Sequence, residues 1–195
     1  MAPLNLHKIS LAVASVAVLT VGLAACGSPD ETTVEAASGT GSTGESASGD
    51  SGGDAVLSMP RLSVEAATEA AEAALAQCQS DDLPFVSVAV VDRFGQVQAM
   101  LRGDNAAEHT MESARLKAYT SAAFGRNTSE LTEAATGDGP TISDLPGMLF
   151  LGGGVSIKAD GASIAGIGVG GAPEGALDEA CAQAGLNAIS DSLGG

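Results

Sequence analysis

Several side chains that could coordinate a metal or bind a carboxylate lie in one stretch, residues 109–126. His109, Met111 and Tyr119 offer nitrogen, sulfur and oxygen donors to a metal. Three cations in the same stretch could bind the carboxylates of a ligand: Arg115, Lys117 and Arg126. The whole chain has only 8 lysines and arginines against 24 acidic residues, so this basic cluster is distinctive. These residue types are suited to metal coordination and to carboxylate binding.

Each of these residues also has an ordinary structural explanation. A lone histidine before a helix is commonly an exposed neighbour of the helix cap, and the methionine and tyrosine are suited to packing in a core. Arg115 and Lys117 could lie on a solvated helix face. They could also form salt bridges with Glu112 or Glu108. The residue types alone leave these alternatives open.

Residues 1–25 are typical of a lipoprotein signal peptide. Lys8 provides the positive charge, and Ile9–Leu23 is an uncharged apolar run, shorter than the roughly 20 residues that a membrane-spanning helix needs. The run ends in Leu23-Ala24-Ala25-Cys26-Gly27, which looks like a bacterial lipobox. We therefore expect an exported protein, anchored to the outer face of the cell membrane by lipid on Cys26.

Residues 26–58 are rich in glycine, serine and acidic residues and contain no lysine or arginine. Such a segment buries too little apolar surface to order itself, so it predicts a flexible tether. The composition changes at Met59, which predicts one folded domain over residues 59–195. The net charge of −16 excludes the basic surface that a nucleic-acid partner requires.

If Cys26 carries lipid, Cys78 and Cys181 remain. An even pair of cysteines in an exported protein favours a disulfide. The alternative is two buried free thiols that pack as small hydrophobic side chains.

Hydrophobic periodicity predicts helices at 64–79, at 111–124 and from 173 onward. We expect Thr110 to cap the second helix and Gly125 to end it, and Asn127 and Glu130 to form the capping box of a further short helix. Strands are predicted at 85–92 and 97–102, as a hairpin, and at 147–151, 155–158 and 162–169. The order α-β-β-α-α-β-β-β-α predicts a single α+β domain with helices packed on a mainly antiparallel sheet of about five strands.

The glycine-rich run Gly166–Gly171 matches the pattern G-x-G-x-x-G. A dinucleotide-binding fold would need another strand and an acidic residue about 20 residues later, and the residues after Gly171 leave room only for a helix. We expect these glycines to let the last strand and helix pack closely. No serine lies in a G-x-S-x-G motif, so the sequence gives little support for nucleophilic catalysis.

Five strings, in this order, resemble the GlcG/HbpS haem-binding family, also called the haem-degrading domain family. They span the whole predicted domain and are Val88–Asp92, Arg93–Gly95, Lys117–Arg126, Leu149–Val155 and Gly166–Ala172. The chain departs from the family at Ser156, where proline is common, and at Gly170, where serine is common. Neither change affects the expected fold, but both bear on which ligand is bound.

The resemblance implies that haem is the cofactor and that the protein is a homo-oligomer. Haem needs an axial donor, apolar cover and cations for its propionates, and no other metal is expected. Thr120 lies in the string that the family uses near its haem. The predicted haem-binding residues are therefore His109, Met111, Arg115, Lys117, Tyr119, Thr120 and Arg126.

Three functions are consistent with the resemblance. The first is a membrane-tethered protein for haem capture or for redox sensing beside a membrane sensor kinase. The second is an enzyme that degrades haem or acts on another small molecule. The third is an oligomeric interaction module for a sensor kinase.

Overall fold

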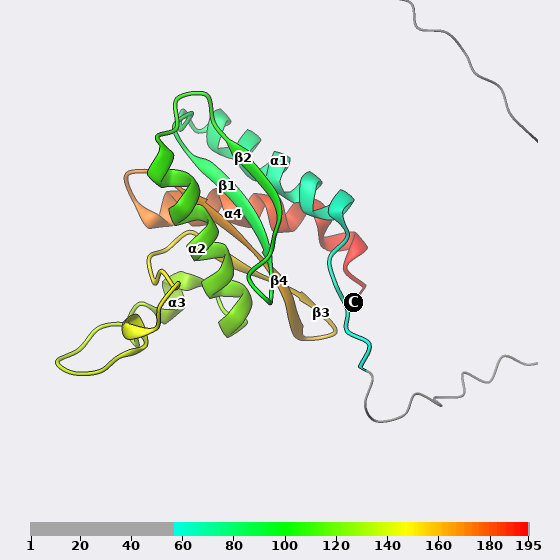
Figure 1. The fold of residues 1–195 in the computed structure, drawn as a ribbon. Helices are drawn as coiled ribbons and strands as arrows, with labels where there is room; N and C mark the ends of the chain where they lie inside the picture. Colours follow the sequence, from blue (N-terminus) through cyan, green and yellow to red (C-terminus); the bar gives the residue numbers. More distant parts are fainter. Residues whose placement is uncertain (1–56, 195) are drawn as a thin grey trace, which may run out of the picture. The chain divides into compact units, whose positions relative to one another are not determined.

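The computed structural model describes residues 57–194, so the predicted signal peptide, Cys26 and nearly all of the predicted tether lie outside the described residues. No helix among residues 57–194 is long and apolar enough to cross a membrane. Figure 1 shows the elements of the domain. Their bounds are α1 Val64–Ser80, β1 Ser87–Asp92, β2 Val97–Arg102, α2 Glu108–Phe124, α3 Thr128–Leu131, η1 Ile142–Asp144, β3 Gly154–Ala159, β4 Ala162–Gly170, α4 Gly175–Ile189 and η2 Ser190–Ser192.

The four strands form one sheet in the order β2-β1-β4-β3, and every neighbouring pair is antiparallel. Helix α2 packs on one face of the sheet, while α1 and α4 pack together on the other (Figure 1). The predicted α+β class with an antiparallel sheet is confirmed. The described residues contain four strands rather than about five.

The predicted strand at 147–151 is wrong. Pro146 has no N–H for a ladder, and Gly147 has a φ of 77°, so the chain turns where the strand was expected to begin. Side chains hold the next residues in place: the backbone N–H of Leu149 donates to Thr120 Oγ1 at 2.9 Å. The ring of Phe150 packs edge-on against Phe124, with centroids 5.6 Å apart. The apolar run is therefore tied to α2 instead of joining the sheet.

Two predicted caps are also wrong. Helix α2 begins at Glu108, so Thr110 lies in its first turn, where its hydroxyl donates to the Ala107 carbonyl and bonds Ser87. Asn127 does occupy the N-cap position of α3, but it forms no capping box: its side-chain oxygen accepts the N–H of Ser156 at 3.4 Å, and its amide donates to Glu179 Oε1 at 3.2 Å. Gly125 ends α2 in the left-handed conformation, φ 63°, as predicted.

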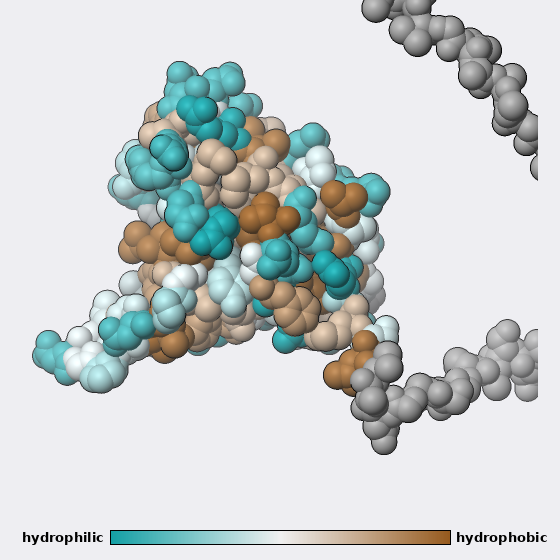
Figure 2. Space-filling view, in the orientation of Figure 1, coloured by the Kyte–Doolittle hydropathy of each residue, from teal (hydrophilic) through white to brown (hydrophobic). Residues whose placement is uncertain are grey.

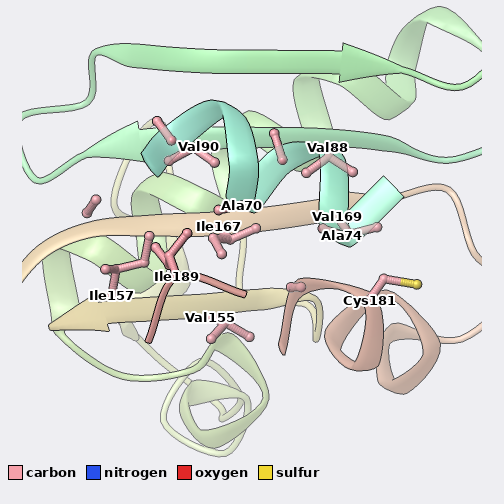
Figure 3. Close-up of a cluster of buried hydrophobic side chains, with 14 of the residues drawn as sticks. Ala70, Ala74, Val88, Val90, Val155, Ile157, Ile167, Val169, Cys181 and Ile189 are labelled. Carbon is pink, nitrogen blue, oxygen red and sulfur yellow. The ribbon is translucent and has the colours of Figure 1, made fainter. Parts of the chain in front are cut away.

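The larger core cluster lies between the sheet and the α1–α4 layer. Figure 3 shows Val88, Val90, Ile167 and Val169 of the central strands pointing into it, together with residues of both helices. The helices contribute small side chains such as Ala70, so they approach each other and the sheet closely. A core with few aromatic rings fills its volume by this close approach.

The other face of the sheet is shaped by glycines. A Cβ atom at Gly166 would collide with the Ala118 carbonyl of α2, and one at Gly168 with the Ala114 carbonyl. The glycines therefore allow close packing of a helix on the last strand, as predicted, but the helix is α2. The last helix, α4, lies on the opposite face of the sheet.

Cys78 of α1 and Cys181 of α4 form a disulfide, with their Cα atoms 5.4 Å apart. Both residues are fully buried, and 103 positions separate them in sequence. The bond closes a loop that contains the whole sheet and α2. It therefore restricts the unfolded chain far more than a local bridge would.

Replacing both cysteines by alanine should lower the free energy of unfolding by about 2–5 kcal/mol, because the unfolded chain regains the loop entropy. Urea denaturation followed by circular dichroism measures the loss. The matched control is the wild-type chain under reducing conditions, which should lose a similar amount. Equal stability of the oxidised wild type and the double variant would contradict a stabilising bridge.

Candidate functional site

Helix α2 distributes the predicted site residues along its length and around its axis. Its 17 residues span about 25 Å. His109 lies in the first turn, and Arg126 follows the last one. These two residues therefore lie too far apart to hold opposite edges of one small ligand within one chain.

Lys117 is inside the protein. Its side chain is 5% exposed, and its ammonium donates to Asp178 Oδ2 at 2.6 Å and to the Val169 carbonyl at 3.0 Å. The prediction that Lys117 binds a ligand carboxylate does not fit this position. The two alternatives, a solvated face or a salt bridge with Glu112 or Glu108, do not fit either, because the partner lies in α4.

Asp178 completes this buried ion pair from the first turn of α4. Burial raises the pKa of its carboxyl, and the Lys117 ammonium and backbone N–H groups, including that of Ala172, act in the opposite direction. A Cβ atom at Gly153 would lie 2.9 Å from the Lys117 ammonium and 2.7 Å from the Asp178 Cβ. Glycine at this position is what lets the segment before β3 pass over the pair.

Met111, Arg115 and Tyr119 follow one another at intervals of four residues and so share one side of α2. Tyr119 packs, with Met100, against the small cluster under α2. Arg115 donates two hydrogen bonds to Glu112, at 2.9 and 2.8 Å. These bonds lower the pKa of Glu112 and raise that of Arg115. Arg115 thus forms one of the salt bridges that the sequence left open.

Thr120 lies on a different side of α2, in line with His109 but about 16 Å from it along the axis. His109 is exposed, whereas Thr120 is fully buried. The Thr120 hydroxyl lies 2.8 Å from the Leu116 carbonyl and 3.6 Å from the sulfur of Met148, and it accepts the N–H of Leu149. It anchors the segment 147–151 to the helix.

An apolar pocket of about 340 Å³ lies next to this anchor. We call it the Met148 pocket. Figure 1 shows that the segment between α3 and β3 projects from the body of the domain, and the pocket lies in the residues around its base. In Figure 2 hydrophobic side chains appear among hydrophilic ones at that base. The lining residues are Thr132, Ala135, Thr136, Ser143, Met148, Leu149, Phe150 and Leu151.

Arg126 is an exposed cation near the start of α3. Its Nε donates to Glu130 Oε2 at 3.1 Å, and both side chains are more than half exposed. Such a pair is weak in water, so Arg126 can exchange its partner for a ligand carboxylate at little cost. Of the three predicted cations, it has the most exposed side chain.

A second pocket, of about 300 Å³, lies where the chain enters α1. No predicted site residue lines either pocket, but Thr120 contacts two lining residues of the Met148 pocket, Met148 and Leu149. Within residues 57–194, no group of three or more histidine, cysteine, aspartate or glutamate side chains could hold a metal ion. Of these two pockets, only the Met148 pocket has lining residues bonded to a predicted site residue, Thr120. Met148 was not among the residues predicted from the sequence, although it lies next to the string Leu149–Val155 that carries part of the resemblance.

The fold is that of a small α+β domain with an apolar pocket in the segment that joins α3 to β3. The family model of the HbpS-like haem-degrading proteins matches residues 62–187. The chain therefore belongs to the HbpS-like family, which confirms the predicted resemblance.

Solved structures support this assignment. HbpS is 46% identical over 70% of this chain and 96% of its own, with a TM-score of 0.67. A double mutant of Streptomyces reticuli HbpS is 45% identical over 70% of this chain and 92% of its own, also with a TM-score of 0.67. PduOC, solved as a complex with haem, is 30% identical over 67% of this chain and 96% of its own, with a TM-score of 0.60. No curated protein matches the chain.

Breaking the buried ion pair should destabilise the domain strongly. Lys117→Met leaves Asp178 buried without its partner and should cost about 3–5 kcal/mol of unfolding free energy. The double variant Lys117→Met/Asp178→Asn should recover much of this loss, because the asparagine is neutral and still accepts the N–H of Ala172. Urea unfolding of the wild type and both variants measures the difference.

The pH dependence of this stability loss tests whether the unpaired Asp178 carboxylate causes it. Without Lys117, burial acts on Asp178 with less opposition, so its folded pKa rises further above the unfolded value. The loss in Lys117→Met should therefore shrink at acidic pH, where the carboxyl is protonated in both states, and grow as pH rises through the folded pKa. A loss that does not change with pH would contradict an unpaired buried charge.

Proposed function

We propose that the protein binds haem at the Met148 pocket. The observation that carries the proposal is the position of Thr120, which the resemblance assigns to the haem region and which anchors the segment that forms one wall of this pocket. The haem complex of PduOC, 30% identical, supports the choice of ligand. The family description, haem-degrading, supports it too.

The types of residue in the Met148 pocket are suited to haem. Leu149, Phe150 and Leu151 supply apolar cover that excludes water from a flat ring. Arg126 does not line the pocket, but of the three predicted cations it is the one whose weak, exposed ion pair leaves it able to bind a propionate. When bound, haem would supply a redox-active iron. Lys117 is excluded from this role, because the buried Asp178 satisfies its charge.

We propose further that the domain works outside the cell, tethered by lipid on Cys26. The signal-peptide pattern and the lipobox support this location. The Cys78–Cys181 disulfide supports it independently, because structural disulfides persist in oxidising compartments. Haem capture, or redox sensing beside a membrane sensor kinase, is the role we favour. A homo-oligomer and a kinase partner are proposals that rest on the resemblance alone.

Haem degradation is the second candidate, because the family is described as haem-degrading. Incubating the haem-loaded protein with a reductant and oxygen distinguishes the two. Simple binding leaves the Soret band in place, whereas degradation removes it and yields a defined product.

Titration of haem into the full chain in detergent should give a saturable shift of the Soret band. Ala135→Trp should weaken binding at least about tenfold, because the indole fills the pocket that Ala135 lines. Ala180→Trp, at an exposed position of α4 outside the pocket, is the matched control. No shift in the wild type would contradict haem binding, and equal affinities in all three proteins would contradict the location.

Cys26→Ser should abolish acylation, because the sulfur is the expected point of attachment. Labelling of expressing cells with a radioactive fatty acid, followed by membrane fractionation, measures this. Cys181→Ser is the control, since it removes a cysteine but keeps Cys26. Labelling of the Cys26→Ser chain would exclude the proposed anchor.

A further inference from the structure

We infer that Met148 is the residue that donates an axial ligand to the haem iron. The inference rests on the proposed haem binding and adds the atom that would hold the metal. Met148 lines the pocket and is half-buried, and its sulfur lies 3.6 Å from the Thr120 hydroxyl. A thioether is an established axial ligand of haem iron.

Thr120 itself is committed to the fold. Its hydroxyl has one proton, and the Leu116 carbonyl at 2.8 Å is a better acceptor for it than the sulfur at 3.6 Å. The oxygen also accepts the N–H of Leu149, and the side chain is fully buried. Moving this oxygen to a metal would release the segment that forms the pocket wall. The sulfur has no such commitment and remains available.

The other donors predicted from the sequence lie elsewhere. His109 is about 16 Å along α2 from Thr120 and is exposed. Met111 and Tyr119 lie on another side of the helix, where Tyr119 packs beside Gly95. Among residues 57–194, the remaining polar side chains of the pocket are neutral hydroxyls, those of Thr132, Thr136 and Ser143. Of the pocket's side chains, Met148 carries the donor best suited to haem iron.

A thioether ligand has a measurable consequence. It favours ferrous over ferric iron and so raises the reduction potential of the haem. It also gives ferric haem a sulfur-to-iron charge-transfer band in the near infrared. Both signatures report on the ligand and not only on whether haem is bound.

The test uses the full chain in detergent, loaded with haem. Met148→Leu keeps the volume and the apolar character of the side chain but removes the sulfur, so the pocket should still take haem. We expect this variant to lose the near-infrared band and to have a lower reduction potential. Met111→Leu is the matched control and should keep both signatures.

The possible results distinguish haem binding itself from the assignment of Met148 as the ligand. A wild-type chain that binds no haem overturns haem binding itself. A Met148→Leu chain with the wild-type band and potential overturns the ligand assignment, while haem binding stands. If Met148→Leu folds, as judged by circular dichroism, but loses haem, Met148→His should restore binding with a nitrogen-ligand spectrum. Failure of that restoration overturns the assignment.

Discussion

The close approach of α2 to β4 determines where the site can be. It exists because Gly166 and Gly168 present no side chains to the helix, so the backbones pack almost directly on each other. This contact fixes the rotation of α2, with Ala114 and Ala118 against the sheet. The rotation decides which sides of α2 stay accessible to a ligand. The candidate ligand-binding side chains of residues 109–126 lie on different sides of the helix.

The same contact explains the buried ion pair. A lysine on the inner side of a helix so close to the sheet cannot reach solvent, and Lys117 instead reaches Asp178 of α4, past Gly153. The pair links the helix on one face of the sheet to the first turn of a helix from the other layer. The segment before β3 passes over it, and that segment continues from the pocket wall at Leu149–Leu151. The wall of the pocket is therefore continuous in sequence with the segment that covers the charge pair.

Short-range sequence patterns predicted the secondary structure and the fold class. They did not predict features that depend on contacts between residues distant in sequence. Strand alternation, Gly125 and the family strings led to the helices, to four of the five predicted strands and to the fold class. The strand at 147–151 was wrong because Phe150 packs against Phe124 and the N–H of Leu149 donates to Thr120, contacts with residues that are distant in sequence. A signal for Lys117 existed: it lies at helical spacing between Ala114 and Ser121, on the small-residue side of α2. Its partner could be identified only from the tertiary structure.

Electrostatics makes a metal ligand more important here than in a neutral protein. A net charge of −16 repels a dianionic porphyrin, and the predicted cations do little to offset it, because Lys117 is neutralised and Arg115 is paired with Glu112. Arg126 can offer one exposed charge. Affinity must then come from apolar burial and from a bond to iron. A neutral thioether meets this requirement without a further charge, and the segment that carries Met148 is held in place by Thr120. The acidic charge of the protein thus explains why a neutral thioether suits haem binding at this pocket.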